Sequence, residues 1–150
     1  MKELIQVSFL DSMSISASAL TATRLRMDVI AENMANSNTT RTENGEPYRR
    51  KYVVFQERTS DRDFATFFNR SRMHPGGVRV IEIGKDMSEF KYDYNPSHPD
   101  ADENGYVRYP NVEVVQEMVD MMAAYRAYEA NITALNAFKD MAVKTLELGK

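Results

Sequence analysis

The chain has 150 residues, of which 43% are hydrophobic and 27% are charged, and its formal net charge is -3. These values are typical of one globular domain with a buried core and disfavour a largely disordered chain. The slight excess of acidic residues disfavours a nucleic-acid partner, and the absence of cysteine excludes disulfides, thiolate zinc sites and cysteine nucleophiles.

The first ten residues contain the only apolar run that could suggest a targeting segment. This run, residues 4–10, is interrupted by Gln6 and Ser8 and stops at Asp11. It is too short for a signal-peptide core, and nothing in the chain approaches the roughly 20 apolar residues that span a bilayer. We therefore expect no direct membrane span and, if the protein is exported, export without a cleaved signal peptide.

Residues 9–36 are expected to form one long amphipathic helix, within an N-terminal segment 1–36. Proline and glycine are absent from residues 1–44, and a polar asparagine-rich cluster at 33–38 ends the pattern. Apolar side chains recur at seven-residue spacing, which is typical of a helix that packs along one seam. The predicted seam residues are Leu10, Met13, Leu20, Met27, Ile30 and Met34.

Residues 37–110 are expected to form a small β-rich domain. This segment contains all five prolines and five of the six glycines. Short β-like runs occur at 51–56, 78–83, 90–94 and 106–109, and the aromatic run 64–68 is compatible with a strand, a helical turn or a packed loop.

Residues 111–150 are expected to contain a second long helix, spanning 111–148. Pro110 precedes it, Asn111 is a suitable cap, and Glu113 and Glu117 suit the positive end of the helix dipole. Its apolar residues follow a heptad pattern typical of coiled coils. The predicted seam residues are Met118, Met121, Tyr125, Tyr128, Ile132 and Leu135. The sequence thus predicts an α+β fold, with the terminal helices packed as a coiled-coil-like pair and the β-rich domain inserted between them.

Candidate chemistry is sparse, and no catalytic or cofactor-binding residue can be named. The two histidines, His74 and His98, lie far apart in the sequence, each beside a proline. Residues 100–105, DADENG, match the first half of a calcium-binding loop. However, Asn111 occupies the twelfth position, where a bidentate carboxylate is needed, and two prolines prevent a preceding helix. We expect no metal site, and a small metal-binding or regulatory module that uses this loop is the alternative function.

Charge is distributed unevenly within the middle segment. Basic residues predominate from 41 to 80, whereas acidic residues predominate from 81 to 104. One interpretation is a solvated mixed surface. The other is that the basic residues contact acidic residues of a neighbouring copy. The basic set is Arg49, Arg50, Arg58, Arg62, Arg70 and Arg72, and the acidic set is Glu82, Asp86, Glu89 and Asp93.

Specific patterns occur at both ends and in the middle of the chain. Residues 18–36 read SALTATRLRMDVIAENMAN, and residues 111–131 read NVEVVQEMVDMMAAYRAYEAN. Both resemble the terminal signatures of bacterial flagellar axial proteins, and residues 45–55 and 95–107 resemble the proximal rod members of the basal-body rod family. The matching asparagines are Asn33, Asn36, Asn111 and Asn131. Glu32 and the stretch 58–77, which is longer than is usual in that family, depart from the pattern.

This resemblance implies a structural subunit rather than an enzyme, and no cofactor. It implies export through the flagellar type III apparatus and assembly in the periplasm, with other copies and other rod proteins, as a helical tube that transmits torque. The terminal helices would form the inner layer of the tube and become ordered on assembly.

Overall fold

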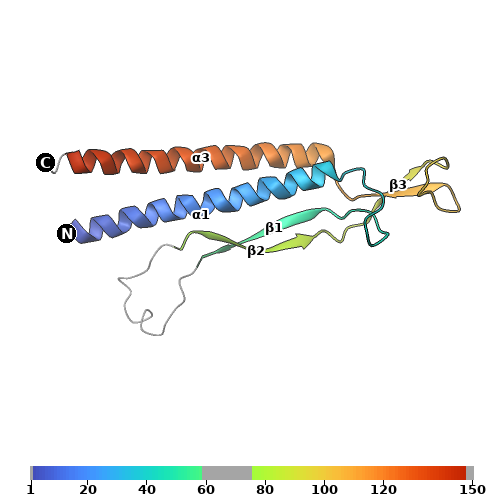
Figure 1. The fold of residues 1–150 in the computed structure, drawn as a ribbon, viewed down its shortest axis with the longest axis horizontal. Helices are drawn as coiled ribbons and strands as arrows, with labels where there is room; N and C mark the ends of the chain where they lie inside the picture. Colours follow the sequence, from blue (N-terminus) through green and yellow to red (C-terminus); the bar gives the residue numbers. More distant parts are fainter. Residues whose placement is uncertain (1, 59–75, 148–150) are drawn as a thin grey trace, which may run out of the picture. The chain divides into compact units, whose positions relative to one another are not determined.

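A computed structural model describes residues 2–58 and 76–147 of the chain. Within these residues, two long helices are separated in sequence by four short strands (Figure 1), so the α+β fold class is confirmed. The elements are α1 (Lys2–Ala35), β1 (Lys51–Glu57), β2 (Val78–Lys85), β3 (Lys91–Tyr94), β4 (Tyr106–Tyr109) and α3 (Val114–Glu147).

The four predicted strand segments are confirmed, whereas both helix starts differ from the prediction. The N-terminal helix begins at Lys2 rather than near residue 9. The C-terminal helix begins at Val114 rather than at 111, because the Glu113 carbonyl accepts the first helical hydrogen bond, from the Glu117 amide at 2.9 Å. The ambiguous run 64–68 and most of the stretch 58–77 lie outside the described residues.

The chain forms two compact units, and each contains part of both helices and part of β1 and β2. The first unit comprises 1–24, 55–81 and 125–150, and the second comprises 25–54 and 82–124. The division of the sequence at 36/37 and 110/111 stays a prediction. Neither helix contains, within the described residues, a stretch long and apolar enough to cross a membrane.

In the first unit, the start of β2 is fastened to α1. The Ser18 hydroxyl donates to the Ile15 carbonyl at 2.7 Å and accepts from the Val78 amide at 3.0 Å. Gly77 makes this approach possible, because it has a φ of 74° and a Cβ there would lie 2.4 Å from the Ser18 Oγ. A residue without a side chain is therefore required where the strand meets the helix.

In the second unit, a small apolar core lies beside a β-hairpin. The buried residues include Val29 and Ile30 of α1, together with Val107 and Val112. Strands β3 and β4 pair antiparallel, with Tyr94 opposite Tyr106. Because side chains alternate across a strand, the hairpin buries Val107 on one face and exposes Tyr106 on the other.

Candidate functional site

Asn33 lies at the centre of a buried polar network in the second unit. Its side-chain amide donates to the Lys51 carbonyl at 2.9 Å and to the Glu117 Oε2 at 3.0 Å. Its Oδ1 accepts from the Tyr48 hydroxyl at 3.0 Å and from the Lys51 amide at 2.9 Å. Both donors and both acceptor positions of this fully buried amide are therefore satisfied. The residue joins the end of α1 to β1 and to the first turn of α3.

Glu117 brings a carboxylate into the same buried position. It is fully buried, and its Oε1 accepts a hydrogen bond from the Arg50 Nε at 2.6 Å. The Arg50 guanidinium also approaches Asp120 at 3.5 Å and Asp86 at 4.0 Å. A buried carboxylate is tolerated only when it is paired and hydrogen-bonded, and Arg50 and Asn33 provide both.

Tyr48 completes the network beside Asn33. Burial, followed by the charges of Glu32 and Glu117, raises the pKa of Tyr48 to about 12. The Lys51 ammonium pairs with Glu32 and lies 5.7 Å from the centre of the Tyr48 ring. The tyrosine therefore remains a neutral hydrogen-bond donor throughout the physiological pH range.

The predicted helix cap Asn111 has a different role. Its Oδ1 accepts from the Arg50 amide at 2.9 Å, and its side-chain amide donates to the Asp86 carbonyl and to the Ser88 hydroxyl. The capping prediction is wrong, because α3 begins only at Val114 and this side chain instead connects the residue before β1 to the segment that follows β2. Asn111 thus reaches the Arg50 backbone, whereas Glu117 binds the side chain of the same residue.

The other two motif asparagines make local contacts. The Asn36 amide donates to the Glu32 carbonyl at 2.9 Å, at the end of α1. The Asn131 amide donates to the Ala127 carbonyl at 2.8 Å, within α3. The structure therefore brings two of the four asparagines into one network.

The predicted seam residues of α1 all lie on a partly covered face where they are described. Ile30 is buried, and Met13, Leu20, Met27 and Met34 are at most partly exposed. Leu10 belongs to α1, but its side chain lies outside the described part of the chain.

The predicted seam of α3 divides into two faces. Met121, Tyr128 and Leu135 are half-buried and share the inner face of the helix with Glu117 and Ala124, which are buried. Met118, Tyr125 and Ile132 are 49%, 54% and 36% exposed and form, with Val115 and Met122, what we call the outer face. The predicted seam residues of α3 thus differ in exposure within the single chain, and their assignment to one assembly seam stays a prediction.

The calcium-like loop uses its carboxylates for internal contacts. The Asp100 Oδ2 accepts from the Thr40 hydroxyl at 2.8 Å, and the Asp102 Oδ1 accepts from the Asn104 and Tyr106 amides. Within residues 2–58 and 76–147, no three His, Asp or Glu side chains are grouped so as to hold a metal ion. Of the two histidines, His98 accepts a hydrogen bond at Nδ1 from the Asp100 amide, and His74 lies outside the described residues.

Arg50 pairs with carboxylates of its own chain, and the contact of the basic set with a neighbouring copy stays a prediction. Arg49 lies over the Phe90 ring, 4.1 Å from its centre. Arg62, Arg70 and Arg72 are outside the described part of the structure.

Sequence reasoning missed the network of Tyr48, Arg50 and Glu117. One signal was present: Glu117 falls between Val114 and Met121 on the apolar stripe of α3, where a carboxylate needs a buried partner. Its proximity to the helix start instead favoured a role at the helix dipole.

Comparison with known proteins shows that the sequence is similar to flagellar rod components. Residues 13–41 match the family model described as flagella basal body rod protein. Residues 103–148 match the model described as flagellar basal body rod FlgEFG protein C-terminal. The two matched segments contain the ends of α1 and α3 that meet at Asn33 and Glu117.

Curated relatives extend the likeness over nearly the whole chain. The flagellar basal-body rod protein FlgC of Bacillus subtilis (strain 168) is 48% identical, covering 93% of this chain and 97% of the relative. The flagellar basal-body rod protein FlgC of Borreliella burgdorferi is 46% identical, and the match covers 87% of this chain and 90% of the relative. The FlgC protein of Escherichia coli O6:H1 is 42% identical, and the match covers 96% of this chain and 100% of the relative.

Proposed function

Since the chain belongs to the FlgC family of flagellar basal-body rod proteins and is a structural subunit of the rod, we propose that it polymerises as a helical tube through its terminal helices. The tube transmits torque, α1 and α3 form its inner layer, and the residues between them lie outside. The subunit has no enzymatic activity. It reaches the periplasm through the flagellar export apparatus, and it assembles with other copies and other rod proteins.

The observation that carries this proposal is the outer face of α3. A surface helix of a self-sufficient domain has one apolar stripe and an opposite polar face. Here the outer face adds a second apolar stripe, on which Val115 and Met122 are even more exposed than Met118. Burying one such side chain is worth about 1.5–3 kcal/mol, so covering this face in an assembly yields a substantial driving force.

The seam residues of α1 fit the same assembly. The half-buried methionines Met13, Met27 and Met34 retain area that a neighbour can cover. Methionine adapts its shape to different surroundings, which suits contacts repeated along a tube at slightly different geometries. Contacts between different faces of identical subunits generate helical polymers when the rotation between neighbours does not close a ring.

The buried network has a supporting role in this proposal. Asn33 and Glu117 fasten the end of α1 to the start of α3, and Arg50 connects them to β1. We assign this network to fixing the end of α1 against the start of α3, so that the half-buried seam residues near the end of α1 and the exposed residues near the start of α3 are presented together. Asn36 and Asn131, with local contacts alone, have a smaller part in assembly.

The proposal is tested with Met118→Asp on the outer face, because a carboxylate there cannot be buried in an assembled interface without a large cost. Met118 is half exposed in the single chain, so we expect an unchanged urea midpoint but loss of assembled rods and of motility.

The matched control is Ala127→Asp, which places the same carboxylate at an exposed position of the same helix, with no charged residue three or four positions away. It should leave both stability and motility unchanged. Normal rods with Met118→Asp would contradict the assignment of the outer face to assembly.

A further inference from the structure

The β-hairpin exposes an aromatic face that the helices do not explain. Tyr92 pairs with Arg108 across the two strands, and Tyr94 pairs with Tyr106, so these four side chains share one face. Tyr92 and Tyr94 are 63% exposed and Tyr106 is 45% exposed. The Tyr94 and Tyr106 rings meet edge to face with their centres 5.3 Å apart. We call these four residues the tyrosine face.

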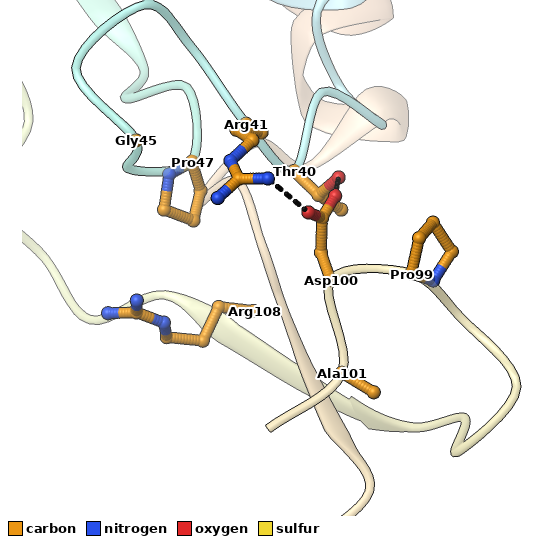
Figure 2. Close-up of a pocket in the computed structure, with 8 residues that line it drawn as sticks. All are labelled: Thr40, Arg41, Gly45, Pro47, Pro99, Asp100, Ala101 and Arg108. Carbon is orange, nitrogen blue, oxygen red and sulfur yellow. Dashed lines mark hydrogen bonds and ion pairs between the residues drawn. The ribbon is translucent and has the colours of Figure 1, made fainter. Parts of the chain in front are cut away.

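A hollow of about 250 Å³ adjoins the tyrosine face at Arg108. Figure 2 shows Arg41 and Arg108 on two sides of this hollow, with the dashed ion pair running from Arg41 to Asp100. That pair measures 3.5 Å, and the Arg41 side chain is 72% exposed. The second oxygen of Asp100 is occupied by the Thr40 hydroxyl. The hollow therefore has two guanidinium groups and one carboxylate, which already has partners.

Arg108 is the group in this hollow that is available to a ligand. Its side chain is exposed, and no described carboxylate lies within ion-pair distance of it. Guanidinium groups bind carboxylates with two parallel hydrogen bonds. Exposed tyrosine together with arginine is also the composition of the residues that dominate protein interfaces.

The surroundings of the hollow restrict the kind of anion. The loop between β3 and β4 carries exposed Asp102 and Glu103, whose charges repel a ligand with many negative charges. An anionic polymer is therefore disfavoured, whereas a single carboxylate within an otherwise apolar protein segment fits both the arginine and the rings.

We propose that the tyrosine face and the adjoining hollow dock a segment of a neighbouring protein subunit that carries one carboxylate beside apolar side chains. The carboxylate pairs with Arg108, and the apolar side chains pack on Tyr92, Tyr94 and Tyr106. This inference rests on the proposed function, because it requires the chain to be built into a rod with neighbours.

The test is site-specific photo-crosslinking in assembled basal bodies. The full chain carries p-benzoylphenylalanine in place of Tyr92, or in a second strain in place of Tyr106, and replaces the native copy. After irradiation, the adduct is isolated and the crosslinked peptide is identified by mass spectrometry. We expect a protein adduct whose peptide contains an Asp or Glu within a few residues of the attachment point.

Arg108 variants connect the adduct to the proposed ion pair. Adding Arg108→Gln should lower the adduct yield by about fivefold, the upper range for an exposed ion pair, and raising the salt concentration should lower it as well. Arg108→Lys should retain most of the adduct yield, because lysine keeps the positive charge. Arg79→Gln is the matched control, because Arg79 is exposed on a strand and bonds only the neutral Gln56 in the described chain. This variant should leave the yield unchanged.

Several results would overturn the proposal: no protein adduct at either position although rods assemble, a glycan adduct, a peptide without a carboxylate, or a yield insensitive to Arg108→Gln. If the unsubstituted chain itself is absent from purified basal bodies, the proposed function fails instead, and the two failures are thus distinguishable.

Discussion

At the scale of single residues, Asn33 stands out because its fully buried side chain donates two hydrogen bonds and accepts two. Without it, the Tyr48 hydroxyl and the Glu117 carboxylate would each lose a hydrogen bond in a buried position, and the half-buried Lys51 backbone would lose two. Leaving such groups unsatisfied costs about 1–3 kcal/mol each, which is more than the net gain from one ordinary hydrogen bond. The stability of the second unit should therefore depend strongly on this one amide.

Asn33→Ala should lower the free energy of unfolding by about 3 kcal/mol, because the Glu117 carboxylate and the Tyr48 hydroxyl both lose a partner. Urea unfolding followed by tyrosine fluorescence measures this, since the chain contains eight tyrosines and no tryptophan. Asn131→Ala is the control. It removes one local bond on α3 and should change the free energy by less than about 0.5 kcal/mol. Equal effects of the two substitutions would contradict the central role of Asn33.

The raised pKa of Tyr48 predicts that the folded chain loses stability at high pH. Its pKa is raised to about 12 in the folded chain, whereas an unfolded tyrosine ionises near 10. Below pH 10 the hydroxyl is neutral in both states and the free energy of unfolding is unaffected. Between pH 10 and 12 the unfolded state loses the proton first, so the free energy of unfolding falls by up to about 1.4 kcal/mol per pH unit.

Urea midpoints measured from pH 9 to 11.5 check this expectation by comparison with Tyr48→Phe. The variant lacks the hydroxyl and should be less stable at pH 9, because the Asn33 Oδ1 loses a donor. Its midpoint should fall less steeply above pH 10. Parallel pH profiles of the two proteins would show that Tyr48 does not control the alkaline transition.

At the scale of elements, the approach of β2 to α1 depends on Gly77. Its φ of 74° is rare for residues with a side chain, and a Cβ would lie 2.4 Å from the Ser18 Oγ. Gly45 has a φ of 77°, but a Cβ at that position would meet no other atom within 4 Å. A substitution at Gly45 therefore introduces backbone strain alone, whereas a substitution at Gly77 adds a steric conflict.

Gly45→Ala should cost about 1 kcal/mol, the cost of a left-handed conformation, and Gly77→Ala should cost clearly more. Combining Gly77→Ala with Ser18→Ala should recover part of the excess, although the Val78 amide then loses its acceptor. Thermal unfolding of the four proteins measures these differences. If Gly77→Ala is no more destabilising than Gly45→Ala, the contact with Ser18 is not a constraint.

At the scale of the whole molecule, the chain has two 34-residue helices, and α3 carries large apolar side chains that the single chain leaves exposed. Long helices are marginal in water without packing against an apolar face. Dilute monomer should therefore have less helix by circular dichroism than these two elements require, and assembly should raise the helix content. Full helicity in a monomer verified by ultracentrifugation would contradict coupling between ordering and assembly.

The order and type of the elements were determined by local sequence. Proline and glycine are confined to the middle and the very end of the chain, and four alternating or aromatic runs there became β1 to β4. These signals act over a few residues, so they can be read without knowledge of distant contacts. The family likewise followed from terminal patterns, which the comparisons confirmed.

Tertiary structure alone decided which residues meet. Asn33, Arg50 and Glu117 are separated by up to 84 positions, and their pairing depends on how α1, β1 and α3 come together. The same holds for Asn111, which suits a helix cap by local pattern but binds Arg50 because that backbone lies beside it. Tertiary structure also decided which apolar side chains of α3 are covered, because a heptad pattern gives their positions along the helix but not their neighbours. Local preferences are encoded in neighbouring residues, whereas burial and polar pairing are properties of the folded chain.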